Sequence, residues 1–209
     1  MEIKDTYNTI DFASNEVVFK EKNSKFFGYA FPLQSDEEVK PILENLRKLH
    51  PNAGHFCYAY QIGTASTTYR ANDDGEPSNS AGMPIYGQIL SFSVTNVLIV
   101  VVRIFGGVKL GVGGLIAAYK TTAQMVFETC AIVEKTIDIH FIITFDYVNM
   151  NKIMRIIKEK KLEIVSQEME IKEDSGLPLG KIELKTRKKN AEMVFDIFKS
   201  MFQIDIKQL

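Results

Sequence analysis

The apolar run "NVLIVVVRIF" at residues 96–105 constrains the fold of this chain more than any other segment. Its central aliphatic residues follow one another without the apolar and polar alternation of a strand that has one face in water. A run of this kind is typical of a strand whose two faces are both covered. We therefore expect a layered domain of mixed α and β structure, with this strand in its interior.

The segments around this strand predict the rest of a first domain. Apolar periodicity and turn residues indicate the following elements. We expect strands at 16–32, 54–63 and 96–105, and helices at 36–50, 84–93 and from about 113 to 130.

A second domain is predicted from a change in composition after "VEKT" at 133–136, where glycine becomes rare and basic residues outnumber acidic ones. We place the domains at residues 1–134 and 135–209. The periodicity of the second predicts strands at 136–145, 162–171, 181–187 and 203–207 and helices at 146–161 and 191–201. This strand–helix–strand–strand–helix–strand order is that of a ferredoxin-like α+β fold.

An acidic loop at residues 70–85, "RANDDGEPSNSAGMPI", is too rich in glycine and proline for a regular helix or strand. It carries three carboxylates, those of Asp73, Asp74 and Glu76. One hypothesis for them is structural: an aspartate caps a turn, Gly75 takes a positive φ, and carboxylates pair with Arg70 or Arg103. The other is a Mg²⁺ site, since this ion needs only one or two protein carboxylates when a phosphate completes its shell. The sequence leaves both open, and the metal is unknown.

A glycine-rich loop, "FGGVKLGVGGLIAAYK" at residues 105–120, joins the apolar strand to a helix. Glycines let a ligand approach the main-chain N–H groups, and a helix start offers unpaired donors and a positive dipole end. We therefore expect a phosphate or nucleic-acid site here, formed by Arg103, Gly106, Gly107, Lys109, Gly111, Gly113 and Gly114. The alternative is that the glycines only permit tight packing of the strand on the helix. The spacing matches neither a Walker A loop nor a dinucleotide-binding motif.

No residues are predicted to be catalytic. His55 and Cys57 share one face of a strand but lie too far apart along it for a hydrogen-bonded pair. On the opposite face, Phe56, Tyr58 and Tyr60 predict either a core or a platform for stacked bases, and we favour the core.

The two loops carry a family resemblance. "DDGEPSNSAGMPI" followed by "VVRIFGGVKLGVGGLIAAY" resembles the paired signature of the YigZ/IMPACT family, and "HPNAGHFCYAY" at 50–60 resembles a further conserved stretch. The sequence departs from the pattern at Asn79 and Ser80, where Gly-Thr is usual, and at Ala117, where a basic residue is usual.

The resemblance implies a bacterial two-domain member, without the additional partner-binding domain of the eukaryotic members. Its N-terminal domain would resemble the second domain of small-subunit ribosomal protein five. Its ferredoxin-like C-terminal domain would resemble the last domain of elongation factor G. The eukaryotic relatives are linked to translational control, so the resemblance implies a place among translation or RNA proteins.

Two functional hypotheses follow. The preferred one is a non-enzymatic binding protein associated with RNA or the ribosome, a translation regulator that needs no cofactor and uses the glycine-rich loop. The alternative is a phosphate-handling enzyme that binds Mg²⁺ at the acidic loop. We expect a cytoplasmic protein with no membrane contact, because no apolar stretch reaches the length of a membrane span. The sequence does not name a protein partner.

Overall fold

The structure is a computed structural model that describes residues 4–171 and 178–209. Contacts divide the chain into two compact units. The first comprises residues 7–135, and the second comprises residues 136–209 together with residues 4–6. The division lies one residue from the predicted boundary, but the N-terminal residues group with the second unit because Asp5 accepts a hydrogen bond from the Ile137 N–H and pairs with Arg187. The chain as a whole is of mixed α and β structure, as predicted.

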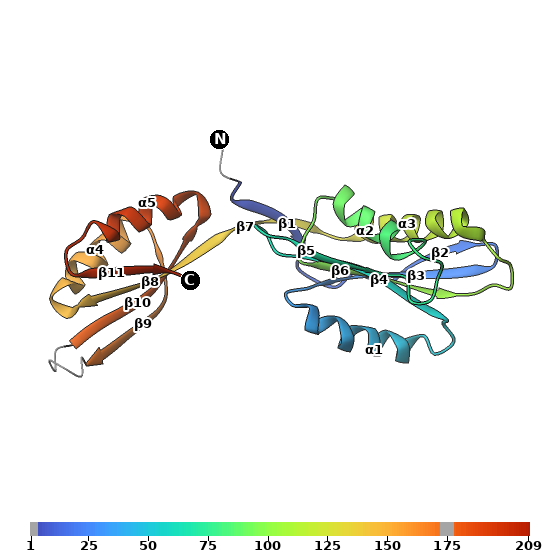
Figure 1. Ribbon diagram of the computed structural model, residues 1–209, viewed down its shortest axis with the longest axis horizontal. Coiled ribbons are helices and arrows are strands. Elements are labelled where there is room, and N and C mark those ends of the chain that lie inside the picture. Colours follow the sequence, from blue (N-terminus) through green and yellow to red (C-terminus); the bar gives the residue numbers. More distant parts are fainter. Residues whose placement is uncertain (1–3, 172–177) are drawn as a thin grey trace. The chain divides into compact units, whose positions relative to one another are not determined.

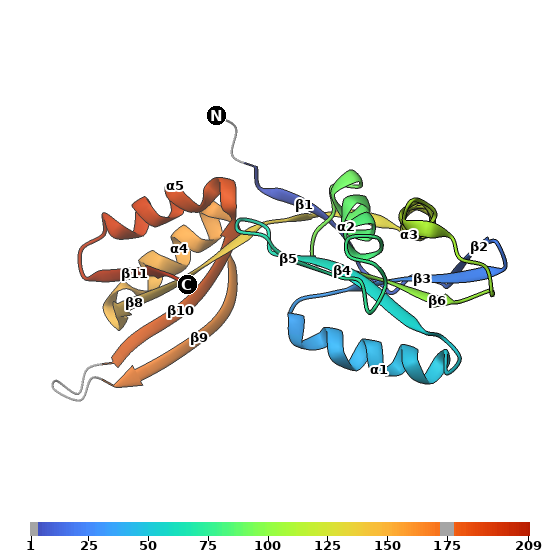
Figure 2. The same ribbon diagram turned by 45° about the vertical axis from the view of Figure 1, so that its right-hand side comes forward.

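The first unit is a five-stranded antiparallel sheet with helices on both faces (Figures 1 and 2). In spatial order its strands are β2 (Val17–Glu21), β3 (Ser24–Pro32), β6 (Val97–Ile104), β4 (His55–Ile62) and β5 (Thr68–Asn72). Its helices are η1 (Asp36–Glu38), α1 (Val39–Leu49), α2 (Gly82–Ser91) and α3 (Gly111–Thr129). A separate two-stranded sheet pairs β1 (Thr6–Ile10) with β7 (Ile132–Thr136).

Strand β6 lies at the centre of the sheet and contributes to two hydrophobic cores. Val97, Ile99 and Val101 pack in the core beneath α2 and α3. The alternate residues of β6 pack in the core beneath α1, as do Phe56 and Tyr58 of β4. The prediction of a strand covered on both faces is therefore confirmed, and the aromatic face of β4 belongs to a core.

The predicted single strand at 16–32 is wrong. The chain reverses at Lys22 and Asn23, whose φ angles are 44° and 65°, and β2 pairs with β3 as a hairpin. Two successive residues with positive φ are what a tight two-residue hairpin turn requires. Strand β5, which lies beside β4, was not predicted.

The second unit has a four-stranded antiparallel sheet and two helices. Its sheet order is β11 (Ile204–Gln208), β8 (Asp138–Asp146), β10 (Pro178–Arg187) and β9 (Glu163–Ile171). The helical segments are η2 (Tyr147–Asn149), α4 (Met150–Lys160) and α5 (Lys188–Lys199). The core lies between the helices and one face of the sheet, where Phe141, Ile143 and Phe145 of β8 are buried. The elements follow the order predicted from the sequence.

Among the helices of the described residues, none is both long and apolar enough to cross a membrane.

The contact between β3 and α3 depends on a glycine. A Cβ atom at Gly28 would lie 2.6 Å from Val126 Cγ2 and 2.9 Å from the Cγ2 atoms of Thr122 and Val17. All three neighbours are β-branched and have little rotamer freedom. We predict that Gly28→Ala lowers the free energy of unfolding by about 1–3 kcal/mol, because it overpacks this contact.

Urea unfolding followed by circular dichroism measures the effect. Gly87→Ala is the matched control, because Gly87 lies within α2 and a Cβ there meets open space. This change should stabilise the protein by up to about 1 kcal/mol through helix propensity. Equal stability of Gly28→Ala and the wild type would contradict the prediction.

Candidate functional site

Asp73 of the acidic loop caps helix α2. Its Oδ1 accepts hydrogen bonds from the backbone N–H groups of Ala81 and Gly82, at 2.9 and 2.8 Å, and its Oδ2 accepts one from Asn79 at 2.9 Å. A carboxylate at this position satisfies donors that the first turn of a helix leaves unpaired and interacts favourably with the helix dipole. Asn79 itself has a φ of 60°, a conformation that favours glycine and asparagine over other residues.

Asp74 fixes the acidic loop to strand β4. Its Oδ2 accepts a hydrogen bond from the Phe56 N–H at 2.7 Å and lies 3.5 Å from Nη2 of Arg47. Its carbonyl oxygen lies 2.9 Å from Nδ1 of His55. The next residue, Gly75, has a φ of +87°, as the structural hypothesis predicted. The tight turn at Gly75 and the side chain of Asp74 together hold the acidic loop against the sheet.

Glu76 is buried and pairs with Arg103. Its Oε1 lies 2.6 Å from Arg103 Nη1 and accepts a hydrogen bond from the hydroxyl of Tyr119 at 2.7 Å. The carboxylate side chain is 4% exposed and the arginine side chain 7% exposed. The three residues come from the acidic loop, β6 and α3, so this cluster joins three segments that are distant in sequence.

The three carboxylates therefore serve different parts of the fold: the start of α2, the edge of β4 and a buried guanidinium. They do not converge on one point. Across residues 4–171 and 178–209, no group of three or more His, Cys, Asp or Glu side chains is placed to hold a metal ion. The contacts are those of the structural hypothesis, with Arg103 rather than Arg70 as the partner of Glu76.

Cys57 lies beside the buried cluster. Its Sγ is 3.0 Å from the carbonyl oxygen of Asp73 and 3.3 Å from the hydroxyl oxygen of Tyr119. Burial raises the pKa of the Cys57 thiol and that of the Tyr119 hydroxyl far above their usual ranges. Both groups keep their protons near neutral pH, so the thiol is no nucleophile there.

The glycine-rich loop has a buried side and an open side. A Cβ atom at Gly106 would lie 2.0 Å from the backbone carbonyl carbon of Asn23, so only glycine fits against the β2–β3 hairpin. Gly107 and Gly111 have φ angles of +85° and +74°, and a Cβ atom at either residue, or at Gly113, would meet open space.

The open side of the loop carries the start of helix α3. Leu110, at the N-cap position of this helix, makes no side-chain capping hydrogen bond, and Gly114 packs against it. Lys109 is exposed, as are the apolar side chains of Phe105, Val108 and Val112. Of the predicted residues, Gly107, Lys109, Gly111 and Gly113 are exposed on this surface. Gly106 packs against the hairpin, and Arg103 is not part of the surface because its guanidinium is buried against Glu76.

Tyr119 is the residue of the site that sequence reasoning missed. It belongs to the "GLIAAY" segment that follows the glycines, and it is fully buried in α3. Its ring packs edge-on against Phe26 at 5.2 Å between centroids, which directs its hydroxyl to Glu76. An isolated tyrosine on a helix gives no signal of such a partner, since the contact spans 43 residues of sequence.

The buried ion pair leads to a stability prediction. Glu76→Ala should lower the free energy of unfolding by about 3–5 kcal/mol, because it leaves the Arg103 guanidinium buried without a counter-charge. The control Glu37→Ala removes an exposed carboxylate and should change stability by less than about 0.5 kcal/mol. Both are measured by urea unfolding.

A second variant separates the charge from the packing. The double variant Glu76→Leu, Arg103→Met should be more stable than Glu76→Ala and recover much of the free energy of unfolding that Glu76→Ala loses. The reason is that two apolar side chains leave no buried charge unpaired. A loss of under about 1 kcal/mol for Glu76→Ala would show that the pair is not needed for stability.

Comparison with known proteins agrees with the resemblance of the two loops. A family model described as the Impact N-terminal domain matches residues 22–127. The IMPACT family member YvyE of Bacillus subtilis is 33% identical over 156 residues, which cover 75% of this chain and 71% of that protein. An IMPACT family member of Haemophilus influenzae is 33% identical over 158 residues, which cover 72% of this chain and 75% of that protein. A solved structure described as a hypothetical protein covers 99% of this chain and 98% of its own, at 22% identity and a TM-score of 0.69, which shows a shared fold.

Proposed function

Because this chain belongs to the IMPACT family, we propose that it is a cytoplasmic binding protein of the translation apparatus that contacts RNA phosphates through its glycine-rich loop. It acts without chemical turnover and without a cofactor. The family resemblance supports the link to translation, and the surface at the start of α3 supports the phosphate contact.

The observation that carries the proposal is the open backbone at the start of α3. A helix of this length, 19 residues, presents a positive dipole end and unpaired N–H donors at its first turn. Within the part of the chain that the structure describes, the N-cap residue makes no side-chain capping hydrogen bond, and a Cβ atom at Gly111 or Gly113 would meet open space. Exposed Lys109 adds a cation beside them. Backbone donors and an adjacent cation together suit a phosphate oxygen.

The surroundings of the loop favour a nucleic acid over a lone anion. Phe105 follows β6 directly and is 51% exposed, so its ring is accessible to a base. Lys120 is exposed further along α3 and is available to a second phosphate. Arg103 has no role in this contact, since Glu76 already neutralises it. The proposal therefore rests on Lys109 and the backbone.

No contact of the acidic loop favours the Mg²⁺-dependent alternative. Both oxygens of Asp73, Oδ2 of Asp74 and Oε1 of Glu76 already accept hydrogen bonds from the backbone or from Arg103, so a metal at these atoms would compete with those contacts. Loss of these bonds would cost stability at each position.

We assign the second unit to the ferredoxin-like class and the first to the class of the second domain of small-subunit ribosomal protein five. The antiparallel order β11-β8-β10-β9, with one helix before β9 and one before β11, supports the ferredoxin-like assignment of the second unit. Both classes occur in translation proteins, which supports the proposed function by analogy of fold.

The proposal predicts a change in the salt dependence of RNA binding. The logarithm of affinity for single-stranded RNA should fall linearly with the logarithm of salt concentration, with a slope of about −0.7 for each neutralised phosphate. Lys109→Ala should weaken binding and reduce this slope by about 0.7. Fluorescence anisotropy titrations at several salt concentrations measure both quantities.

Lys48→Ala is the matched control, because Lys48 is an exposed lysine on α1, on the opposite face of the sheet from α3. It should leave affinity and slope unchanged. Absence of RNA binding by the wild type at low salt would refute the proposal, as would equal slopes for Lys109→Ala and the wild type.

A further inference from the structure

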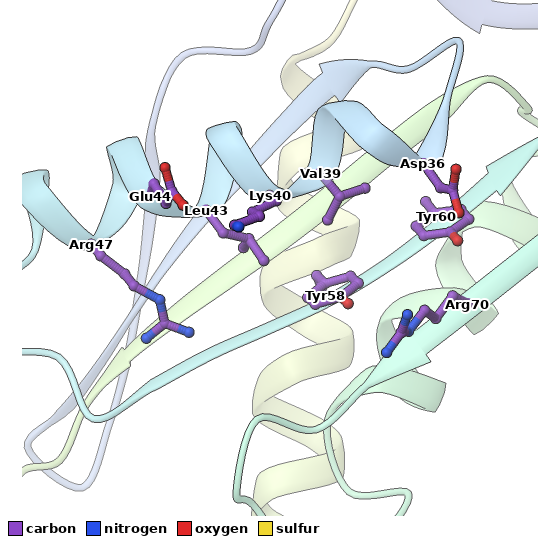
Figure 3. Close-up of a pocket in the computed structure, with 9 residues that line it drawn as sticks. All are labelled: Asp36, Val39, Lys40, Leu43, Glu44, Arg47, Tyr58, Tyr60 and Arg70. Carbon is purple, nitrogen blue, oxygen red and sulfur yellow. The ribbon is translucent and has the colours of Figure 1, made fainter.

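A groove lies between helix α1 and strands β4 and β5, on the face of the sheet opposite α2 and α3 (Figure 3). Its volume is about 380 Å³, within the range of small-molecule sites. The groove exists because α1 packs over β3, β4 and β6, whereas β5 at the sheet edge contributes a charged residue to this face instead of core. It is lined by Asp36, Val39, Lys40, Leu43, Glu44, Arg47, Tyr58, Tyr60 and Arg70.

The floor of the groove combines an apolar surface with two phenol groups. Val39 and Leu43 of α1 face Tyr58 and Tyr60 of β4 across it. Both tyrosine rings are over 90% buried, and neither hydroxyl has a hydrogen-bond partner within the described part of the chain. Burial raises the pKa of Tyr60, so its hydroxyl stays protonated and can donate a hydrogen bond. A flat ligand with polar groups at its edges fits this surface, because its faces can contact the apolar side chains and its edges can bond to the tyrosine hydroxyls.

Cations surround this floor on both sides. The side chains of Arg47 and Arg70 lie on either side of Tyr58 in Figure 3, with Lys40 on the α1 side. Arg47 is held over the ring of Phe56, 4.4 Å from its centroid, and lies 3.5 Å from Asp74.

Two further cations have no such partner. Among residues 4–171 and 178–209, neither Arg70 nor Lys40 forms an ion pair. Of the two carboxylates that line the groove, Glu44 points away from the strands in Figure 3, and Asp36 lies at the end near Tyr60. Arg70 and Lys40 therefore line the groove as cations with unused donors.

The geometry points to a binding site for a nucleoside phosphate in this groove. The phosphate binds Arg70, which supplies charge-assisted hydrogen bonds, and Lys40 adds a cation on the α1 side of the groove. The nucleoside lies against Val39 and Leu43, and its polar groups bond to the hydroxyls of Tyr58 and Tyr60. Inorganic phosphate alone would leave the apolar wall and the phenol groups unused. The ligand is either a free mononucleotide or the 5′-terminal nucleotide of an RNA, which share this chemistry.

This site is separate from the glycine-rich loop, because α1 and α3 cover opposite faces of the sheet. The inference goes beyond the proposed function and does not need it to hold.

Isothermal titration of the full chain with AMP, UMP and inorganic phosphate tests the site. Arg70→Ala should weaken mononucleotide binding about tenfold or more, because a charged partner of the phosphate is lost. Tyr58→Phe removes only a hydroxyl and should weaken binding about threefold to tenfold. The control Lys48→Ala should bind as the wild type does. Circular dichroism establishes that each variant is folded.

A second arm distinguishes the two sources of the ligand. RNA of one sequence is titrated with either a 5′-phosphate or a 5′-hydroxyl. Saturable binding of the free mononucleotides identifies a small-molecule site. Tighter binding of the 5′-phosphate RNA than of the 5′-hydroxyl RNA, lost in Arg70→Ala but kept in Lys48→Ala, identifies the RNA end.

Three results would overturn the inference. The first is that neither mononucleotides nor 5′-phosphate RNA bind in preference to their controls at millimolar concentration. The second is that folded Arg70→Ala and Tyr58→Phe bind as tightly as the wild type. The third is that inorganic phosphate binds as tightly as AMP, which would reduce the groove to a simple anion site. If only RNA binding through Lys109 fails, the proposed function fails and the groove site stands.

Discussion

The organisation of the first unit depends on the buried ion pair between Glu76 and Arg103. A charge removed from water is stable only when it is paired and hydrogen-bonded. Tyr119 supplies a further hydrogen bond to the same carboxylate oxygen. Because the three side chains belong to the acidic loop, β6 and α3, the loop cannot separate from the sheet without leaving a buried charge unpaired. The same interaction fixes the strand from which the glycine-rich loop begins.

This pairing decides which groups are available to a ligand. The carboxylates of the acidic loop accept hydrogen bonds from backbone N–H groups and from an arginine, so they stabilise the fold. The exposed backbone at the start of α3, with Lys109, is available on one face of the sheet. The groove between α1 and β5 is available on the other. The buried side of the two loops thus serves the fold, and the proposed binding uses the open side of the glycine-rich loop.

Several features could be predicted from the sequence because their causes are local. The unbroken aliphatic run predicted a central strand covered on both faces, and residues Val97 to Val102 are indeed fully buried. Apolar periodicity predicted the order of elements in the second unit. Gly75 was predicted to take a positive φ, because an acidic loop of this composition needs a tight turn. The hairpin at Lys22 and Asn23 was missed, since neither residue is glycine, and the polar residues 20–25 were read as part of one continuous strand.

The sequence by itself determined the central strand, most of the other strands and helices, and the two loops, together with a set of charged residues that could pair. Only the tertiary structure decided how those charges are used. It turned Arg103 inward to Glu76 and away from the glycine-rich loop, and it left Arg70 facing a groove. The physical reason is that a side chain's partner depends on strand register and on which helix covers each face. Glu76 meets Arg103 across 27 residues, and the groove joins residues of α1 to residues of β4 and β5, contacts that no local pattern encodes.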